Sequence, residues 1–245
     1  MPSHVVHRVV GERICEFSSE EIDKLVDSFG RHDASRYSCS HLLAHDKQVL
    51  SRFGDKGLCY LVLHHYLDKF MNIVFGRVWH YGKIRTLIDP ASVAKRVFEY
   101  LEVAVRRGFE DEISVFKVLE VVVHRLGGAR LEELRHRLDG GVQEAIIEHR
   151  VGEYFESLGY SKSTAREKAR LFIGILKNCL ADLQSLEPGD IELLRKIISV
   201  TRSLREKIAT NAKWILCTAT QLDQEYVRRS LGVLADTIIQ LCNKG

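Results

Sequence analysis

The chain has 245 residues, of which 45% are hydrophobic and 28% are charged, and its formal net charge is +3 at pH 7. This length and composition allow a core that folds without help from metals or disulfides, and they exclude long disordered tails. The small positive surplus permits an anionic partner but does not indicate one by itself, because nucleic-acid binding requires basic residues gathered on one face.

The six cysteines are widely spaced and form no C-x-x-C pair; they are Cys15, Cys39, Cys59, Cys179, Cys217 and Cys242. This spacing is typical neither of a zinc finger nor of a thioredoxin-like motif, so we expect mostly small buried hydrophobic residues in a reducing cytosol. The first ten residues contain His4, His7 and Arg8 and therefore lack the apolar core of a signal peptide. We expect a cytoplasmic protein.

The longest apolar stretch, Gly57 to Phe75, carries His64, His65, Asp68 and Lys69 near its middle. Ionisable side chains at the centre of a bilayer are costly, so we reject a transmembrane segment and a membrane partner.

Hydrophobic residues recur at helical spacing along the whole chain, and no run alternates with a period of two. The pattern predicts an all-α fold, a multi-helix array of nine to eleven helices. We expect two helical subdomains, a His-rich one at residues 1–80 and a second at 81–245.

The first predicted helix starts at a capping box of Ser18 and Glu21 and ends at Gly30. Two further helices are expected at about 38–53 and 56–75. The link between them, Gly54 and Asp55, is short enough to make them antiparallel neighbours.

Residues 76–88 show no clear period and are expected to form an ordered loop. Asp89 and Pro90 then form a strong helix start, an N-cap residue followed by proline, and this helix is expected to run to Arg107. An almost wholly apolar helix follows at about 110–126.

The remaining predicted helices are a short one at 131–138, a longer one that follows it to about 158, one that opens at Thr164 with an apolar face through Leu180, one that follows the break at 188–190 and ends at about 208, and a last one at about 224–243. Thr164 and Glu167 form a second capping box at the start of one of them. The last helix has apolar residues at alternating steps of four and three, which favours packing within the monomer but also suits a homodimer through this helix. The residues of this seam are Val227, Leu231, Leu234, Ile238 and Leu241.

Histidines and carboxylates of the first subdomain form one candidate site. His41 and His45 lie four residues apart on one predicted helix, and His64 and Asp68 lie four apart on the next, so each pair shares a helix face. Imidazole and carboxylate are ordinary ligands of divalent metals. The four residues therefore predict a metal site of a metal-dependent hydrolase, unless these histidines are simply hydrogen-bonded or exposed.

Arg36 and His41 have an R-x4-H spacing that resembles the motif of helical ribonucleases of the HEPN type, and Ser38 fits the polar position two places after the arginine. The resemblance covers six residues. It implies that the arginine and the imidazole act together on an RNA backbone, with the imidazole in acid-base chemistry.

A second candidate site lies near 148–177, where a helix, a turn at 159–161 and a further helix have the layout of a helix-turn-helix. The second helix would offer cations, hydroxyls and its own N-terminus to phosphates. The candidate contact residues are Lys162, Ser163, Thr164, Arg166 and Arg170. Phe155 departs from the motif, which usually has a small residue at that position.

These patterns predict a non-enzymatic helical protein that contacts DNA or RNA through phosphates, without a cofactor. Two alternatives stay open. The first is a hydrolase or HEPN-like ribonuclease with a divalent metal, and the second is a helical interaction or scaffold protein.

Overall fold

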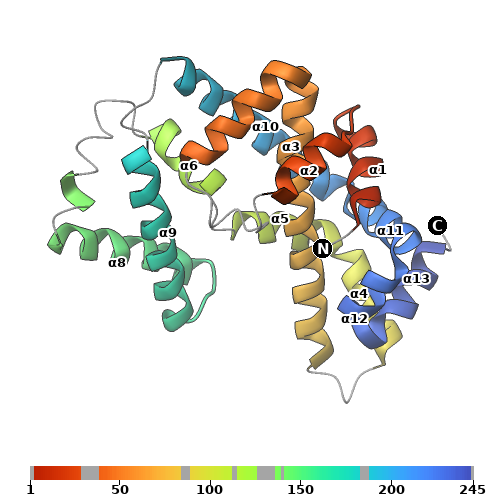
Figure 1. Cartoon of the computed structure of the whole chain (residues 1–245). Helices are drawn as coiled ribbons and strands as arrows, with labels where there is room; N and C mark the ends of the chain where they lie inside the picture. Colours follow the sequence, from red (N-terminus) through yellow and green to blue (C-terminus); the bar gives the residue numbers. More distant parts are fainter. Residues whose placement is uncertain are drawn as a thin grey trace. The chain divides into compact units, whose positions relative to one another are not determined.

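The structure, a computed structural model, describes residues 3–28, 39–83, 89–111, 115–125, 136–138, 141–182 and 188–243. Helices make up nearly all of these residues and none of them lies in a strand, which confirms the predicted all-α class (Figure 1). The helices are α1 (His4–Ile14), α2 (Glu20–Ser28), α3 (Cys39–Lys83), α4 (Pro90–Glu99), α5 (Leu101–Glu110), α6 (Val115–Arg125), α8 (Val142–Ser157), α9 (Lys162–Asp182), α10 (Pro188–Thr210), α11 (Ala212–Leu222), α12 (Gln224–Leu231), the 3₁₀ helix η3 (Gly232–Leu234) and α13 (Ala235–Asn243). In these ranges no helix combines the length and the hydropathy that a membrane span requires.

The contacts within the chain divide it into two compact units. The first unit combines Met1–His32, Arg52–Glu110 and Val200–Gly245, and the second combines Asp33–Ser51 and Asp111–Ser199. Helices α3 and α10 therefore each contribute to both units. Each unit takes segments from both sides of the boundary expected near residue 80, and the two subdomains stay a prediction.

Helix α1 is an element that the sequence analysis did not predict. Val6, Val10 and Ile14 recur every four residues along it and are buried, which is the pattern of an amphipathic helix. Helix α11, against which α1 packs, was likewise not predicted. Both helices belong to the first unit.

The start of α2 differs from the predicted capping box. Ser19, not Ser18, accepts a hydrogen bond from the backbone N–H of Ile22, at 3.3 Å. Ser18 instead donates to the carboxylate of Glu12, at 2.6 Å. Two adjacent serines each have a hydroxyl that can cap the helix. The start of the helix was therefore predicted to within a residue, but the capping residue was not.

The break predicted at Gly54 is confirmed, because the 45-residue element α3 consists of two helices that meet at a kink at this glycine (φ 65°, ψ −159°). Glycine adopts that positive φ without the steric penalty that a side chain brings. Helix α3 also continues to Lys83, so the expected loop at 76–88 is wrong for residues 76–83. The aperiodic side chains there gave no helix signal, but no proline interrupts the backbone hydrogen bonds of the helix before Pro90.

The predicted helix start at Asp89 is confirmed, because its carboxylate accepts two backbone N–H groups of the first turn, at 3.2 and 3.0 Å. The helix expected to run to Arg107 is divided at Tyr100 into α4 and α5. Gly108 does not end a helix but lies inside α5, where an added Cβ would stand 2.5 Å from the side chain of Ile73. Gly108 therefore permits close packing of α5 on α3.

The predicted last helix is divided into α12, η3 and α13 at Gly232, which has a φ of 53°. Four residues of its apolar seam are buried by the chain itself; they are Val227, Leu231, Leu234 and Ile238. The seam therefore packs within the first unit. A homodimer through the C-terminal helix stays a prediction, and it requires another face of that helix.

The cysteines differ from the expectation of free thiols. Cys15 is bonded to Cys59 and Cys217 to Cys242, with Cα atoms 5.7 and 5.1 Å apart, and Cys179 is also in a disulfide. Disulfide formation depends on such Cα distances in the folded chain, which the spacing in the sequence does not determine. The two named bonds join the residue that follows α1 to α3, and α11 to α13.

Helices α1 and α3 pack in antiparallel register at very short range. Three contacts define the register, namely His7 with Asp68, Gly11 with Tyr60, and Cys15 with Cys59. A Cβ added to Gly11 would stand 2.4 Å from the ring of Tyr60 and 2.8 Å from the backbone oxygen of Phe17. Only a residue without a side chain fits at this crossing.

We expect Gly11→Ala to destabilise the protein by about 1–3 kcal/mol, because the added methyl group forces α1 away from Tyr60. Thermal or urea unfolding measures this change. The matched control is Gly174→Ala in α9, where a Cβ meets no atom within 4 Å. That variant should be as stable as the wild type or gain up to about 1 kcal/mol from helix propensity. Equal stability of the two variants would contradict the packing described for Gly11.

Candidate metal centre

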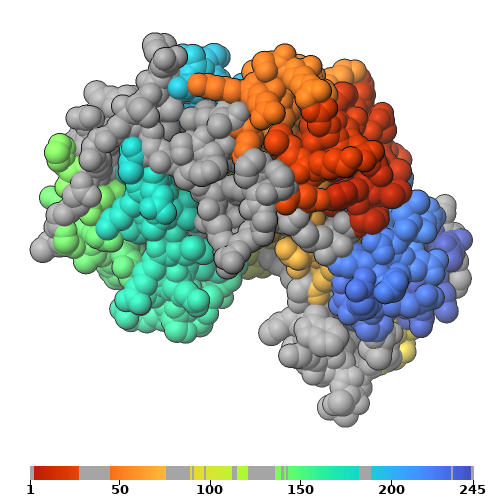
Figure 2. Space-filling view, in the orientation of Figure 1, coloured from red at the N-terminus to blue at the C-terminus, as the bar shows by residue number. Residues whose placement is uncertain are grey.

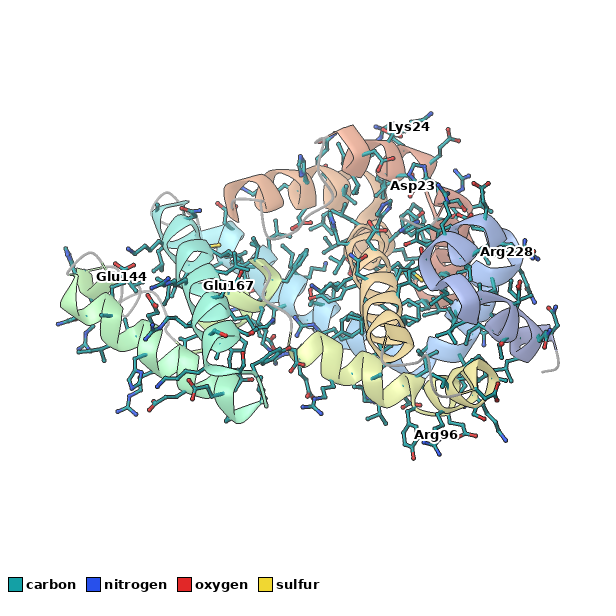
Figure 3. The ribbon with its side chains drawn as sticks, turned by 90° about the horizontal axis from the view of Figure 1, so that it is seen from below. Asp23, Lys24, Arg96, Glu144, Glu167 and Arg228 are labelled. Atoms are coloured by element: carbon teal, nitrogen blue, oxygen red, sulfur yellow. A yellow bond between two sulfur atoms is a disulfide. The ribbon has the colours of Figure 1, made fainter. Side chains whose placement is uncertain are left out.

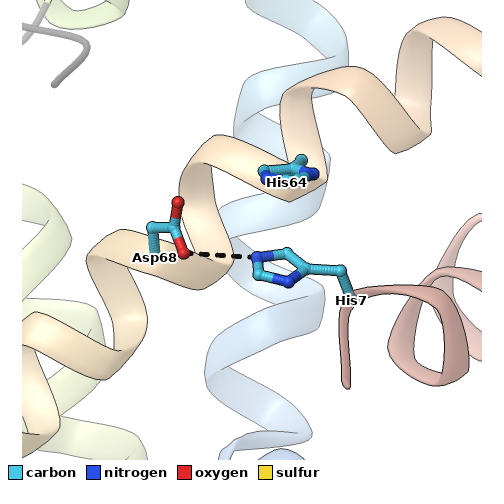
Figure 4. A group of neighbouring side chains, drawn as sticks. All are labelled: His7, His64 and Asp68. Carbon is cyan, nitrogen blue, oxygen red and sulfur yellow. Dashed lines mark ion pairs between the residues drawn. The ribbon is translucent and has the colours of Figure 1, made fainter. Parts of the chain in front are cut away.

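Three buried side chains from α1 and α3 form a cluster of possible metal ligands (Figure 4). His7 comes from α1, and His64 and Asp68 come from α3. Each offers one ligand atom, and these atoms all lie within 4.8 Å of one another. The side chains of His7, His64 and Asp68 are only 1%, 1% and 6% exposed. Imidazole nitrogen and carboxylate oxygen are the donors that Zn²⁺ and similar ions take.

The local fold explains why these side chains meet. His64 and Asp68 lie four residues apart on α3 and therefore share one face of the helix. The close approach at Gly11 then places His7, one turn earlier on α1, opposite this face. The cluster lies entirely within the first unit.

The hydrogen bonds of His7 determine which ring nitrogen faces Asp68. Its Nδ1 lies 3.3 Å from the backbone oxygen of Ser3, which can only accept, so Nδ1 carries the proton. The other nitrogen, Nε2, lies 3.2 Å from Asp68 Oδ1. Either Nε2 carries a second proton and forms an ion pair with Asp68, or the two atoms share a cation.

The spacing of these two atoms fits a shared ion. Two ligands of a tetrahedral zinc, with bonds of about 2.0–2.1 Å, stand about 3.3 Å apart. The observed 3.2 Å between His7 Nε2 and Asp68 Oδ1 is close to this edge. Among the described residues, His7 Nε2 also has no partner in hydrogen-bond geometry. A spacing of 3.2 Å is therefore compatible with two ligands of one ion.

His64 is the third member of the cluster, and its ring lies against the face of the His7 ring. The two rings are stacked, with centroids 4.1 Å apart and planes 21° apart. Burial lowers the pKa of His64, although a hydrogen bond to a nearby carboxylate opposes this effect. His64 is thus neutral at pH 7 and has a nitrogen lone pair to offer.

A partly exposed histidine stands at the edge of the cluster. The ring of His4 lies 6.0 Å from that of His64 and 6.3 Å from that of His7, centroid to centroid. Its Nε2 lies 2.7 Å from a carboxylate oxygen of Asp27. This pair is the part of the histidine group that solvent reaches.

The four metal ligands expected from the sequence are only partly brought together. His64 and Asp68 are in the cluster, whereas His45 is half-buried in the second unit. The side chain of His41, and with it the HEPN-like pair formed with Arg36, lies outside the described residues. His7 was not predicted as a ligand, although Val6, Val10 and Ile14 around it have the helical period that places it on a buried face.

The predicted nucleic-acid contacts lie at the start of α9. Lys162, Ser163, Arg166 and Arg170 are exposed and Thr164 is half-buried. The basic residues are spaced by four and therefore form one stripe along the helix. The cap of this helix is Ser161, whose hydroxyl accepts from the N–H of the third helical residue at 3.3 Å, so the capping box predicted at Thr164 and Glu167 is wrong.

Helices α8 and α9 lie against each other (Figure 2). Ion pairs connect them. Arg170 pairs with Glu148 at 3.0 Å and Lys177 with Glu144 at 2.6 Å. Residues 141–182 contain equal numbers of acidic and basic side chains, and acidic ones such as Glu144 and Glu167 lie along both helices (Figure 3). This hairpin therefore carries no general positive surface.

Phe155, the residue that departs from the helix-turn-helix pattern, is buried between α8 and α9. Its ring meets the ring of Tyr160 edge-on at 6.2 Å, and the amine of Lys168 lies 4.5 Å from the centroid of the Tyr160 ring. A large aromatic residue thus fills the place where the motif has a small one.

Asp46 is a further unusual group, in the second unit. Its side chain is 1% exposed, and among the described residues its Oδ2 has no hydrogen-bond partner. Burial raises the pKa of Asp46 to about 8, so this carboxyl is largely protonated at neutral pH.

The chain matches no protein-family model, and neither a curated protein nor a solved structure matches it.

We expect Asp46→Asn to stabilise the protein at neutral pH. Because the folded state raises the pKa of Asp46 from 3.8 to about 8, folding binds a proton in this range. The wild type should therefore lose stability between about pH 4 and pH 8, by at most on the order of 1 kcal/mol per pH unit from this group. The asparagine side chain does not titrate, so the variant lacks this pH-dependent loss of stability. A melting-temperature difference that grows from pH 4 to pH 8 supports the assignment, and a constant difference refutes it.

Proposed function

We propose that this protein binds a divalent transition-metal ion through His7, His64 and Asp68. The observation that carries the proposal is the 3.2 Å separation of His7 Nε2 and Asp68 Oδ1 within a buried set of three donors. Two imidazoles and one carboxylate suit zinc and its neighbours in the first transition row better than calcium or magnesium, which take oxygen ligands.

The burial of all three donors favours a structural ion over a catalytic one. A catalytic zinc keeps one coordination position open to water and substrate, whereas a structural zinc is enclosed by protein. At 1%, 1% and 6% exposure, these side chains give a substrate little access to the ion. The proposed ion joins α1 to α3, and its binding is therefore linked to the stability of the first unit.

The disulfides affect the proposal of a cytoplasmic location. Cytoplasmic location was expected from apparently free cysteines, but five of the six are bonded in the structure. Such bonds are typical of oxidising compartments and of intracellular proteins of hyperthermophiles. A cytoplasmic location therefore stays a proposal only if this is an intracellular protein of a hyperthermophile.

The metal site is tested by titrating the chelator-treated protein with Zn²⁺. We expect one equivalent to bind and to raise the melting temperature, because the ion binds the folded state. Asp68→Asn keeps the size of the side chain but weakens the ligand, and His7→Ala removes one. Each should reduce the affinity by about 100-fold or more, since even groups outside the coordination shell contribute 10–100-fold.

The control for this titration is His149→Ala, which removes an exposed histidine on α8 that pairs only with Glu153 among the described residues. Its zinc affinity should equal that of the wild type. Absence of binding by the wild type, or equal binding by Asp68→Asn and His7→Ala, would eliminate the proposed site.

A second candidate function is nucleic-acid contact through the start of α9, and one observation favours it. The first turn of this helix carries no acidic residue, although acids are usual there because they balance the helix dipole. Lys162 and Arg166 stand at this end and make no ion pair within the described ranges. A positive helix end flanked by two cations attracts phosphate.

This candidate is tested by fluorescence anisotropy with a labelled DNA or RNA duplex at two salt concentrations. Counterion release predicts that the affinity falls steeply with salt. Replacing Lys162 and Arg166 by Ala should weaken binding and reduce the salt slope by about one per phosphate contact. Arg229→Ala, which removes an exposed cation on α12, is the matched control. No binding at low salt rejects this function.

A further inference from the structure

A buried carboxylate on α2 contacts Nδ1 of the proposed metal ligand His64. Asp23, labelled in Figure 3, is 0% exposed and its Oδ1 lies 3.1 Å from Nδ1 of His64. The same oxygen accepts the hydroxyl of Tyr60 at 2.7 Å. Arg8 approaches the other oxygen, Oδ2, at 3.8 Å. Asp23, Tyr60 and Arg8 lie outside the three donors of the metal centre, to which His64 belongs.

The contact with Asp23 determines the tautomer of His64. A carboxylate only accepts, so the proton of the neutral imidazole sits on Nδ1 and the lone pair on Nε2. His7 is held in the same way, with its Nδ1 on the carbonyl of Ser3. The neutral ring of His64 thus has an unprotonated Nε2, the state that a metal ion requires.

The protonation states within this network are consistent. Burial raises the pKa of Asp23, but hydrogen bonds from His64 and Tyr60 outweigh it and hold the pKa below its usual value. Burial and the contact with Asp23 raise the pKa of Tyr60, so its hydroxyl keeps the proton that it donates. Asp23 is therefore an anion that two donors fix in place.

We propose that Asp23 is a positioning residue of the metal centre, which fixes the orientation and tautomer of His64 and thereby couples α2 to the ion. The proposal rests on the proposed metal-binding function. A carboxylate that accepts the second nitrogen of a metal-bound histidine also makes that histidine a stronger ligand. Tyr60 supports Asp23, and its ring is the same one that limits the space at Gly11.

The test compares Co²⁺ and Zn²⁺ binding by the wild type, Asp23→Asn and Tyr60→Phe. Co²⁺ is followed by its visible absorption, and Zn²⁺ by competition with Co²⁺. We expect Asp23→Asn to bind both ions 10–100-fold more weakly, and Tyr60→Phe to lose less. The shape of the Co²⁺ spectrum should stay the same, because the three ligands are unchanged. Asp27→Asn, at the exposed edge of the cluster, is the matched control and should bind as the wild type does.

A purely structural role for Asp23 predicts a different result. It would lower the melting temperature of metal-free and metal-loaded protein equally, whereas a positioning role reduces the increase in melting temperature that the metal causes. Equal metal affinity of Asp23→Asn and the wild type would overturn the proposal for Asp23 and leave the metal site standing. No uptake of Co²⁺ or Zn²⁺ by the wild type would overturn the metal site itself.

A measurement on the wild type keeps the proposal testable if Asp23→Asn does not fold. Long-range ¹H–¹⁵N spectra of the imidazoles report which nitrogen of His64 carries the proton. We expect Nδ1–H in both the metal-free and the zinc-loaded protein, with a large shift of Nε2 on loading. An Nε2–H tautomer of His64 in the metal-free protein would contradict the positioning role.

Discussion

The close packing of α1 on α3 at Gly11 is the constraint on which the candidate site depends. No larger residue fits between the ring of Tyr60 and the backbone oxygen of Phe17 at this crossing. The short distance between the helices lets His7 reach the face of α3 that carries His64 and Asp68. Tyr60 has two roles here, because its ring sets the distance and its hydroxyl binds Asp23.

The buried charges of the first unit are otherwise difficult to explain. Two carboxylates, Asp23 and Asp68, and two imidazoles are almost wholly enclosed by a helical core. Buried ionisable groups cost stability unless they are paired, hydrogen-bonded or bound to a metal. Asp23 contacts Tyr60 and His64 through one carboxylate oxygen, and the proposed cation would lie between His7 and Asp68. The proposed metal ion would account for a cluster that apolar residues could otherwise replace at less cost.

Much of the fold was predictable from the sequence, because helical periodicity and the cap at Asp89 depend on neighbouring residues. The pair of His64 and Asp68 was predictable for the same reason, since four residues always return to the same helix face. His7 and the bond of Cys15 to Cys59 were not, because they join positions more than forty residues apart whose distance depends on how α1 packs. The break between two helices at Gly54 was predictable as well, because it depends on a local glycine that adopts a positive φ.

The bond between Cys15 and Cys59 has a consequence for an ion held two turns away on α1. It ties the end of this helix to α3 whether or not the metal is present. His7 therefore cannot diffuse away from its two fellow ligands, and its effective concentration near them stays high. Such a tether would let the proposed ion dissociate and return without refolding of the chain.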